Sequence, residues 1–200
     1  MEKIQLEYHE KAKENGVYIV SSCGFDSIPA DLGVVYLKKE FKGDVNSVES
    51  FLDSKVKGGP KGAVIHYGTW ESAVYGLAHA NELKPLRKQL FPNKLPEFTP
   101  KLQRRSPIHK NELVDKWCLP FPGSDKAVVQ RSQRHFFENE KQRPIQFNTY
   151  VVMPNLFSTI AVAFIAVIFG IMTKFSLGRK LLLKVSCATS FQAMIHHKTF

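Results

Sequence analysis

The sequence has few cysteines, and those it has are far apart. Cys23, Cys118 and Cys187 form no Cys-x-x-Cys pair, and no histidine stands at the spacing of a zinc ligand beside any of them. An odd number of isolated thiols predicts neither a disulfide framework nor a zinc site. We therefore expect reduced cysteines in a cytosol-facing protein and no metal site, with Cys23 a buried, inert thiol.

Glycine-rich phosphate loops are absent too. None of the 12 glycines form the Gly-x-Gly-x-x-Gly spacing of a dinucleotide-binding loop. The nearest group, Gly58, Gly59 and Gly62, surrounds Pro60, which has no N–H to offer a phosphate. There is also no Gly-x-Ser-x-Gly elbow, His-Glu-x-x-His pair or Walker loop, and we predict no catalytic residue from motifs alone. The polar N-terminus, residues 1–16, resembles neither a secretory signal nor a transit peptide.

Basic residues are in excess. Lys and Arg number 28 against 18 Asp and Glu, which gives a net charge of +10. The excess is concentrated in Lys84–Arg105, Lys126–Arg143 and Lys174–Lys184. None of these segments carries a nucleic-acid recognition pattern, so we predict no nucleic-acid partner. A membrane surface is the better anionic partner, because the last segment adjoins the most apolar part of the chain.

That apolar part, Leu156–Met172, contains no charged residue. Its length approaches the roughly 17 to 25 residues of the helices that cross a bilayer core. Ile, Val and Phe occupy every face of such a helix, which favours membrane contact over the alternative of a buried core helix. The basic residues that follow would place the C-terminus in the cytosol, so a simple span would export the rest of the chain. Insertion into one leaflet, or into a lipid-droplet monolayer, resolves this conflict.

The remaining pattern predicts alternating helices and strands. A continuous apolar run at Val17–Val20 is typical of a buried strand, and Asp26 or Ser27 can cap the helix that follows it. Thr69 and Ser124 can cap two further helices, and five prolines predict a long basic loop over 83–123. The expected helices are Lys3–Asn15, from residue 27 to about Phe41, Trp70 to about Ala80 and Asp125 to about Glu140; the expected strands are Val17–Val20, Val45–Leu52, Ala63–Tyr67 and Ile145–Met153, with a turn over 57–62.

Three stretches resemble a known family. They are "GVYIVSSCGFDSIPADLGVVYL", "VESFLDSKVKGGPKGAVIHYGTWESAVYG" and "LPFPGSDKAVVQRSQR". With the late hydrophobic stretch, they are similar to the saccharopine dehydrogenase-like oxidoreductases of the wider saccharopine dehydrogenase family, from Lys3 to about Val185. The resemblance implies a Rossmann domain that binds NAD(P), a second α/β domain, association with membranes or lipid droplets, and a role in lipid or glycolipid metabolism.

The resemblance also implies a site. The loop Ser22, Cys23, Gly24, Phe25, Asp26 and Ser27 would border the nicotinamide side of the cofactor. Gly68, Thr69 and Trp70 would face it from the second domain, on the substrate side.

In the family the phosphate-binding fingerprint precedes the segment corresponding to Val17–Val20, and the tail after Val185 departs from the family pattern. We interpret the chain as a central fragment, with an α/β fold made of a remnant of a Rossmann-type parallel sheet and part of a second α/β domain with a hydrophobic helix. The expected parts are residues 1–43 (Rossmann-like), 44–153 (second α/β domain), 154–185 (membrane-associating) and 186–200 (divergent tail).

Two functions stay open at this point. The first is a homologue of NAD(P)-dependent oxidoreductases that, as this chain, binds no cofactor and is inactive. The second is a non-enzymatic protein that binds lipid droplets or membranes. Both place the chain on a lipid droplet or membrane facing the cytosol, with a mitochondrial location and homo-oligomers as further expectations.

Overall fold

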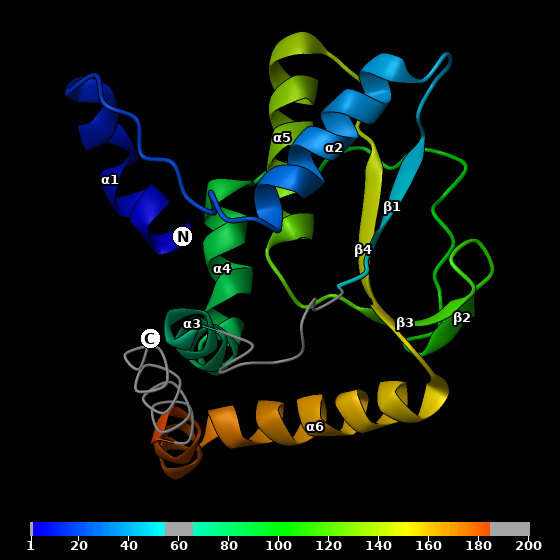
Figure 1. The fold of residues 1–200 in the computed structure, drawn as a ribbon. Coiled ribbons are helices and arrows are strands. Elements are labelled where there is room, and N and C mark those ends of the chain that lie inside the picture. Colours follow the sequence, from blue (N-terminus) through cyan, green and yellow to red (C-terminus); the bar gives the residue numbers. More distant parts are fainter. Residues whose placement is uncertain (1, 55–65, 185–200) are drawn as a thin grey trace, which may run out of the picture. The chain divides into compact units, whose positions relative to one another are not determined.

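The computed structural model describes residues 2–54 and 66–184, which form helices and strands (Figure 1). By contacts these residues divide into two units, with 2–53 and 90–159 in unit 1, and the described residues of 54–89 and 160–184 in unit 2. The elements, in chain order, are α1 (Glu2–Glu14), α2 (Ser27–Glu40), β1 (Ser47–Leu52), α3 (Tyr67–Ala78), α4 (Ala80–Leu90), β2 (His109–Asn111), β3 (Lys116–Pro120), α5 (Asp125–Glu140), β4 (Gln146–Met153) and α6 (Leu156–Lys174).

Unit 1 contains a four-stranded sheet in the order β1-β4-β3-β2. Strands β1 and β4 pair in parallel, with Ser47 opposite Gln146, whereas β3 is antiparallel to both of its neighbours. Parallel strands need a long crossover connection, which here includes α5. The predicted mixed α/β class is confirmed, as are the strands expected over 45–52 and 145–153.

Helices α2 and α5 pack against each other and against the sheet (Figure 1). Val34 of α2 and Val129 of α5 are buried with Phe147 of β4. Inside this layer the Gln133 side chain accepts a hydrogen bond of 3.0 Å from the backbone N–H of Ile145. Full burial of each large apolar side chain stabilises the fold by roughly 1.5–3 kcal/mol, so this layer holds α2 and α5 against the sheet.

The segment Val17–Val20 is not the buried strand that its composition predicts. It forms no strand, and the exposed fractions of Tyr18 and Val20 are 95% and 75%. A strand requires a neighbouring strand to satisfy its N–H and C=O groups, and none of the described strands pairs with this segment. The helix before it is confirmed as α1, which ends at Glu14, and the predicted stop residue Gly16 has a left-handed backbone with φ of 62°.

The prediction that residues 83–123 form one long loop is wrong in its extent. Its first residues belong to α4, and β2 and β3 lie within it. Leu83, Leu86 and Leu90 are half-buried at helical spacing, and Pro85 lies on the exposed side of α4. The regular apolar spacing therefore outweighs the helix-breaking proline, whose cost is about 3 kcal/mol in a helix interior.

Two capping predictions have different outcomes. Asp26 caps α2 as predicted, by accepting a 3.0 Å hydrogen bond from the N–H of Ser27. Helix α3 is confirmed, but its cap is His66 rather than Thr69, since the His66 Nδ1 accepts from the N–H of Gly68. The predicted turn over 57–62 and most of the strand Ala63–Tyr67 lie outside the described residues, and Tyr67 itself begins α3.

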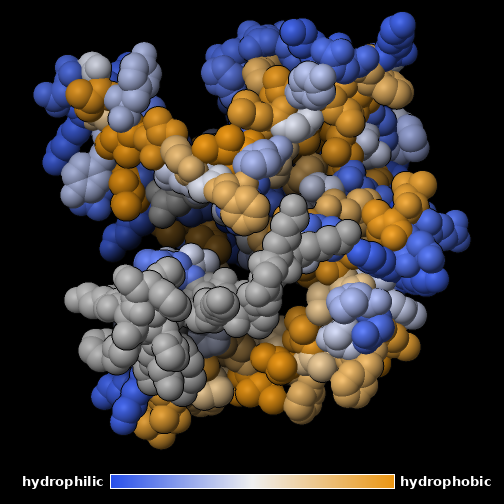
Figure 2. Space-filling model, in the orientation of Figure 1, coloured by the Kyte–Doolittle hydropathy of each residue, from blue (hydrophilic) through white to orange (hydrophobic). Residues whose placement is uncertain are grey.

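Helix α6 is the apolar segment predicted from the sequence. Of the described residues, it is the one helix long and apolar enough to cross a membrane, and only 11% of its most apolar window is buried. Hydrophobic side chains are visible at the surface over α6 in Figure 2. The described residues therefore do not cover α6 as a core helix would be covered.

Candidate functional site

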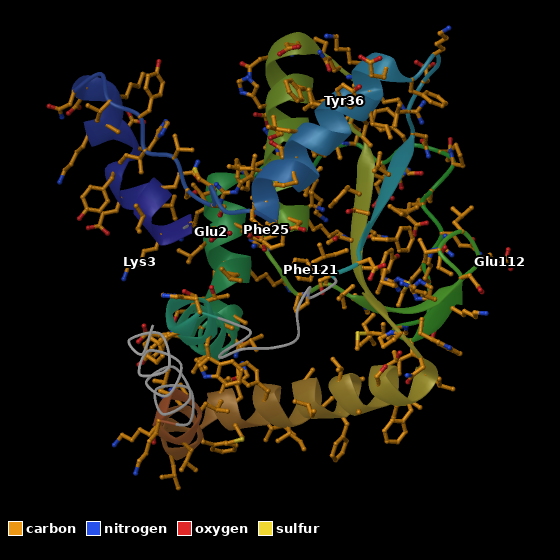
Figure 3. All side chains as sticks on the ribbon, in the orientation of Figure 1. Glu2, Lys3, Phe25, Tyr36, Glu112 and Phe121 are labelled. Atoms are coloured by element: carbon orange, nitrogen blue, oxygen red, sulfur yellow. The ribbon has the colours of Figure 1, made fainter. Side chains whose placement is uncertain are left out.

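The predicted cofactor loop, Ser22–Ser27, leads directly into α2. Ser22 has a left-handed backbone with φ of 59°, which is uncommon for a residue other than glycine. The carbonyl of Gly24 accepts a 3.1 Å hydrogen bond from Ile28 in the first turn of the helix. Phe25, which is labelled in Figure 3, is 77% exposed, whereas Ser27 is buried. The loop thus presents its middle residues to solvent and anchors its last one.

Cys23 in this loop is exposed. The expectation that this thiol is buried is therefore wrong. The reason is the same as for Val17–Val20, because the chain before α2 is not covered by any described strand.

The start of α2 lies beside the start of α5. The hydroxyl oxygens of Ser27 and Ser124 are 2.7 Å apart, at hydrogen-bond distance. Ser124 precedes α5 as predicted, but its side chain makes no capping bond, because its hydroxyl bonds to Ser27. Further along the two helices, Ser132 donates a 2.7 Å hydrogen bond to Asp31. Two helix N-termini, each with a serine and an aspartate, therefore meet at one place in unit 1.

Asp125 is the most unusual residue of this cluster. Its side chain is 95% buried, since 5% of the residue is exposed, and its Oδ1 accepts no hydrogen bond from any described residue. Burial, reinforced by the nearby Asp26 carboxylate, raises the pKa of Asp125. A buried carboxyl with a raised pKa is suited to hold and release a proton. Acidic residues are also common in the first turn of a helix, where they interact favourably with the helix dipole, so the position of Asp125 has an ordinary structural explanation as well. Nothing in the sequence distinguished it from a surface aspartate.

Replacing Asp125 with Asn tests this environment. Because the raised pKa means that the folded protein disfavours the charged form, Asp125→Asn should raise the unfolding temperature by a few degrees at pH 7. The sign follows from linkage: the penalty is absent below the unfolded pKa, near 3.8, and develops as the pH rises through the folded value. Thermal unfolding at pH 7 and pH 3.5 measures it, with Asp44→Asn, at an exposed position, as the control. Equal stability of the Asp125 variant and the parent at pH 7 would show that the carboxyl is solvated.

The predicted substrate residues, Gly68, Thr69 and Trp70, lie in the first turn of α3 in unit 2. Gly68 and Thr69 donate their N–H groups to His66, to its Nδ1 and its carbonyl respectively. The Trp70 indole donates a 3.0 Å hydrogen bond to the carbonyl of Leu182. Its ring also meets that of Phe169 edge to face, with centroids 4.9 Å apart. Trp70 thus connects α3 to α6 and to the helical residues 176–184 that follow it. The two predicted groups of site residues belong to different units.

A second polar cluster lies on the sheet face opposite α2 and α5, and the sequence analysis missed it. Arg105 binds both carboxylate oxygens of Glu49, at 2.7 and 2.5 Å. Arg105 lowers the pKa of Glu49, and burial raises the pKa of Tyr150, which bonds to the same carboxylate. His109 meets the Tyr150 ring edge to face at 5.0 Å and pairs across the sheet with Cys118. Burial raises the pKa of Cys118, which keeps it a thiol and argues against a nucleophile.

Other site chemistry can be stated for the described residues alone. Within 2–54 and 66–184, no group of three or more His, Cys, Asp or Glu side chains is arranged to hold a metal ion. Gly58, Gly59 and Gly62, the nearest approach to a phosphate loop, lie outside those ranges. The features in hand define an α/β protein with two serine-aspartate helix starts in contact and a long apolar helix at the surface.

Comparison with known proteins identifies its relatives. The chain is 43% identical over 191 residues to the human saccharopine dehydrogenase-like oxidoreductase, a match that covers 96% of this chain and 44% of the relative. It is 37% identical to the lipid droplet localized protein of Caenorhabditis elegans, over 96% of this chain and 45% of the relative. An Arabidopsis thaliana relative, named "Probable mitochondrial saccharopine dehydrogenase-like oxidoreductase", is 32% identical over 92% of this chain and 45% of its own length.

The resemblance predicted from the sequence is therefore confirmed: the chain is homologous, along nearly its whole length, to part of the saccharopine dehydrogenase-like oxidoreductases. It spans slightly less than half the length of these relatives. No family model matches the chain, and no solved structure matches it.

Proposed function

We propose that the chain forms part of an NAD(P)-dependent oxidoreductase of this type, which acts at a lipid surface. In this proposal the 200 residues contribute the lipid-binding helix and part of the α/β scaffold. The observation that carries the proposal is α6, whose large apolar side chains are exposed along its length. The name of the Caenorhabditis elegans relative, a lipid droplet localized protein, supports the same location. A membrane or droplet facing the cytosol is the proposed site of action, and a mitochondrial membrane is the second candidate.

The proposed reaction transfers a hydride from NAD(P)H to a carbonyl carbon of a lipid-linked substrate, of which a glycolipid precursor is one class, and a proton to the carbonyl oxygen. We propose that Ser22–Ser27 borders the nicotinamide. Asp125 lies near Asp26 and follows Ser124, whose hydroxyl bonds to that of Ser27 in the loop, and its raised pKa supports a role for that carboxyl in holding the proton.

The 200-residue chain alone is expected to be inactive. The strongest contacts to a dinucleotide are the pyrophosphate bonds to a glycine loop at a helix N-terminus, and its sequence contains no such loop. Titration with NADPH and NADH, followed by cofactor fluorescence, should therefore show no saturation below about 1 mM. Saturable binding in the micromolar range would contradict this prediction and would show that another part of the chain holds the pyrophosphate.

The second candidate function is a non-enzymatic protein that binds lipid droplets or membranes, as a monomer or a homo-oligomer. The exposed apolar surface of α6 favours it as much as it favours the first. One experiment distinguishes the two functions, and it uses this chain joined to the rest of a relative. If that protein floats with lipid droplets and binds the cofactor at micromolar concentration, the enzyme is supported. If it floats but does not bind the cofactor, the non-enzymatic protein is supported.

A further inference from the structure

We infer that α6 enters lipid from one side only: it lies along a monolayer, or in one leaflet of a bilayer, with anionic headgroups at its C-terminal end, and both of its ends stay on the side of the folded protein. The inference rests on the proposed lipid association and adds the topology and the lipid-facing surface. Three observations carry it, namely the exposed apolar surface of α6, the attachment of its C-terminal end to α3, and the charges of the connections to α3.

The two faces of α6 differ in size and burial. Thr159 and Thr173 are both fully buried and lie on one face, because 14 residues make nearly four whole turns. Their hydroxyls bond to backbone carbonyls of the preceding turn, at Asn155 and Gly170, so neither needs water. The opposite face carries large apolar side chains that are exposed: Phe157, Ile160, Phe164, Ile168 and Ile171. Val162, Ile165 and Val167, at other positions around the helix, are exposed as well, so the described residues cover only a narrow stripe of α6 and leave most of its apolar surface available to lipid.

The C-terminal end of α6 is attached to α3. Lys174 donates a 3.0 Å hydrogen bond to the carbonyl of Leu77, near the end of α3. Trp70, in the first turn of α3, packs its ring on Phe169 and bonds to the carbonyl of Leu182. Wherever the end of α6 goes, α3 goes with it while these contacts hold.

The connections to α3 are unsuited to cross a bilayer. On one side of α3 the chain continues as α4, whose 11 residues measure about 16 Å at 1.5 Å per residue, against a hydrocarbon core of about 30 Å. Helix α4 carries four charged residues, Glu82, Lys84, Arg87 and Lys88. On the other side of α3, the sequence between β1 and α3 carries Lys55, Lys57 and Lys61. Moving α3 across a bilayer would draw both connections through it, at the cost of burying these charges.

The N-terminal end of α6 stays with the sheet. Only Pro154 and Asn155 separate β4 from α6, and β4 pairs with strands on both sides. The Asn155 side chain accepts a 2.8 Å hydrogen bond from the N–H of Ser158, which begins the helix next to the strand. Both ends of α6 are thus held by folded polypeptide, and a bilayer cannot separate them.

Charge identifies the lipid. Four basic residues lie at or just after the C-terminal end of α6: Lys174, Arg179, Lys180 and Lys184. Lys174 and Arg179 donate to the carbonyls of Leu77 and Thr173, which orders them, and Lys180 and Lys184 are exposed. Such a group beside an apolar face matches a surface of anionic headgroups.

Fluorescence depth measurement tests the topology. The residues Phe157, Phe164 and Ile171 are seven apart, so they lie on one face about 10 Å from each other along the helix. Each is replaced in turn by Cys and labelled with an environment-sensitive dye, in a chain in which Cys23 and Cys187 are Ser; Cys118 is fully buried and stays. The proteins are bound to vesicles of phosphatidylcholine and phosphatidylserine that carry quenchers at shallow or deep positions, with a dye at the exposed Leu113 as the control.

One-sided insertion predicts the same depth for all three dyes, within a factor of two in the ratio of deep to shallow quenching. A span predicts that the dye at 164 is several-fold more sensitive to the deep quencher than those at 157 and 171, and this result would overturn the inference while leaving lipid association intact. If none of the labelled or unlabelled proteins binds these vesicles or triolein droplets coated with the same lipids, the proposed lipid association itself is wrong. Strong quenching at 113 would contradict both the depth assignment and the exposed face.

Discussion

Replacing Ile165 and Ile168 with Asp should release the protein from lipid droplets into the soluble fraction. Both side chains are exposed, at 62% and 42%, on the outer part of α6. An aspartate near the centre of a membrane-spanning helix costs about 3 kcal/mol, so two in a helix that lies along a lipid surface should lower partition into lipid by up to roughly 10⁴-fold. Flotation with triolein droplets, at low and high salt, measures the bound fraction.

Two controls make this result specific to α6. The pair Tyr18→Asp and Leu113→Asp introduces the same charges at the exposed apolar positions of unit 1, at 95% and 90% exposure, and should float like the parent. Replacing Lys180 and Lys184 with Gln should weaken binding only modestly and make it less sensitive to salt, since each contributes on the order of 1 kcal/mol on an anionic surface. If the α6 variant still floats while the Gln variant does not, binding is electrostatic and α6 is not the inserted element.

The elements that the sequence predicted correctly are those whose pattern is local. Apolar residues alternate over 145–153 and recur at helical spacing over 125–140, and these patterns identify β4 and α5. An apolar residue recurs every second position in a strand and about every 3.6 positions in a helix that buries one face, so neither pattern requires knowledge of the neighbouring elements. The segment Val17–Val20 failed for the opposite reason. Its β-favouring residues indicate that it could form a strand. A strand forms only beside a neighbouring strand, and the described residues supply none. Helix α4 was missed because its one proline, Pro85, and its charges were weighed above the spacing of its three leucines.

The candidate site divides in the same way. Asp26 and Ser124 precede helices, so the sequence alone places them at helix starts. The contact of Ser27 with Ser124 joins residues 97 apart, and that of Arg105 with Glu49 joins residues 56 apart, so neither follows from local pattern. The only sequence signal for the pair of Glu49 and Arg105 was that Glu49 is a charged residue within the alternating pattern of β1. The burial of Asp125 likewise depends on how α2 and α5 pack, which no single-helix pattern encodes.

The Glu49 and Arg105 pair should contribute measurably to the stability of unit 1. The two side chains are 17% and 29% exposed and make two charge-assisted bonds, each of the kind worth about 1.5–3 kcal/mol. Either Glu49→Gln or Arg105→Leu should therefore lower the free energy of unfolding by about 2 kcal/mol at pH 7, because each leaves the other group half-buried without its partner. Urea unfolding measures both.

The double variant decides whether the pair itself is responsible. Its destabilisation should be smaller than the sum of the two single effects by 1 kcal/mol or more, because the second substitution removes a charge that the first has already left unpaired. Lower pH supplies an independent check on the sign. Since Arg105 lowers the pKa of Glu49, the stabilisation is present above the unfolded value near 4.5 and disappears as the pH falls through the folded value. The difference between the parent and Glu49→Gln should thus shrink on acidification, and strict additivity of the single variants at pH 7 would show that this cluster is held by packing around Tyr150 rather than by its charges.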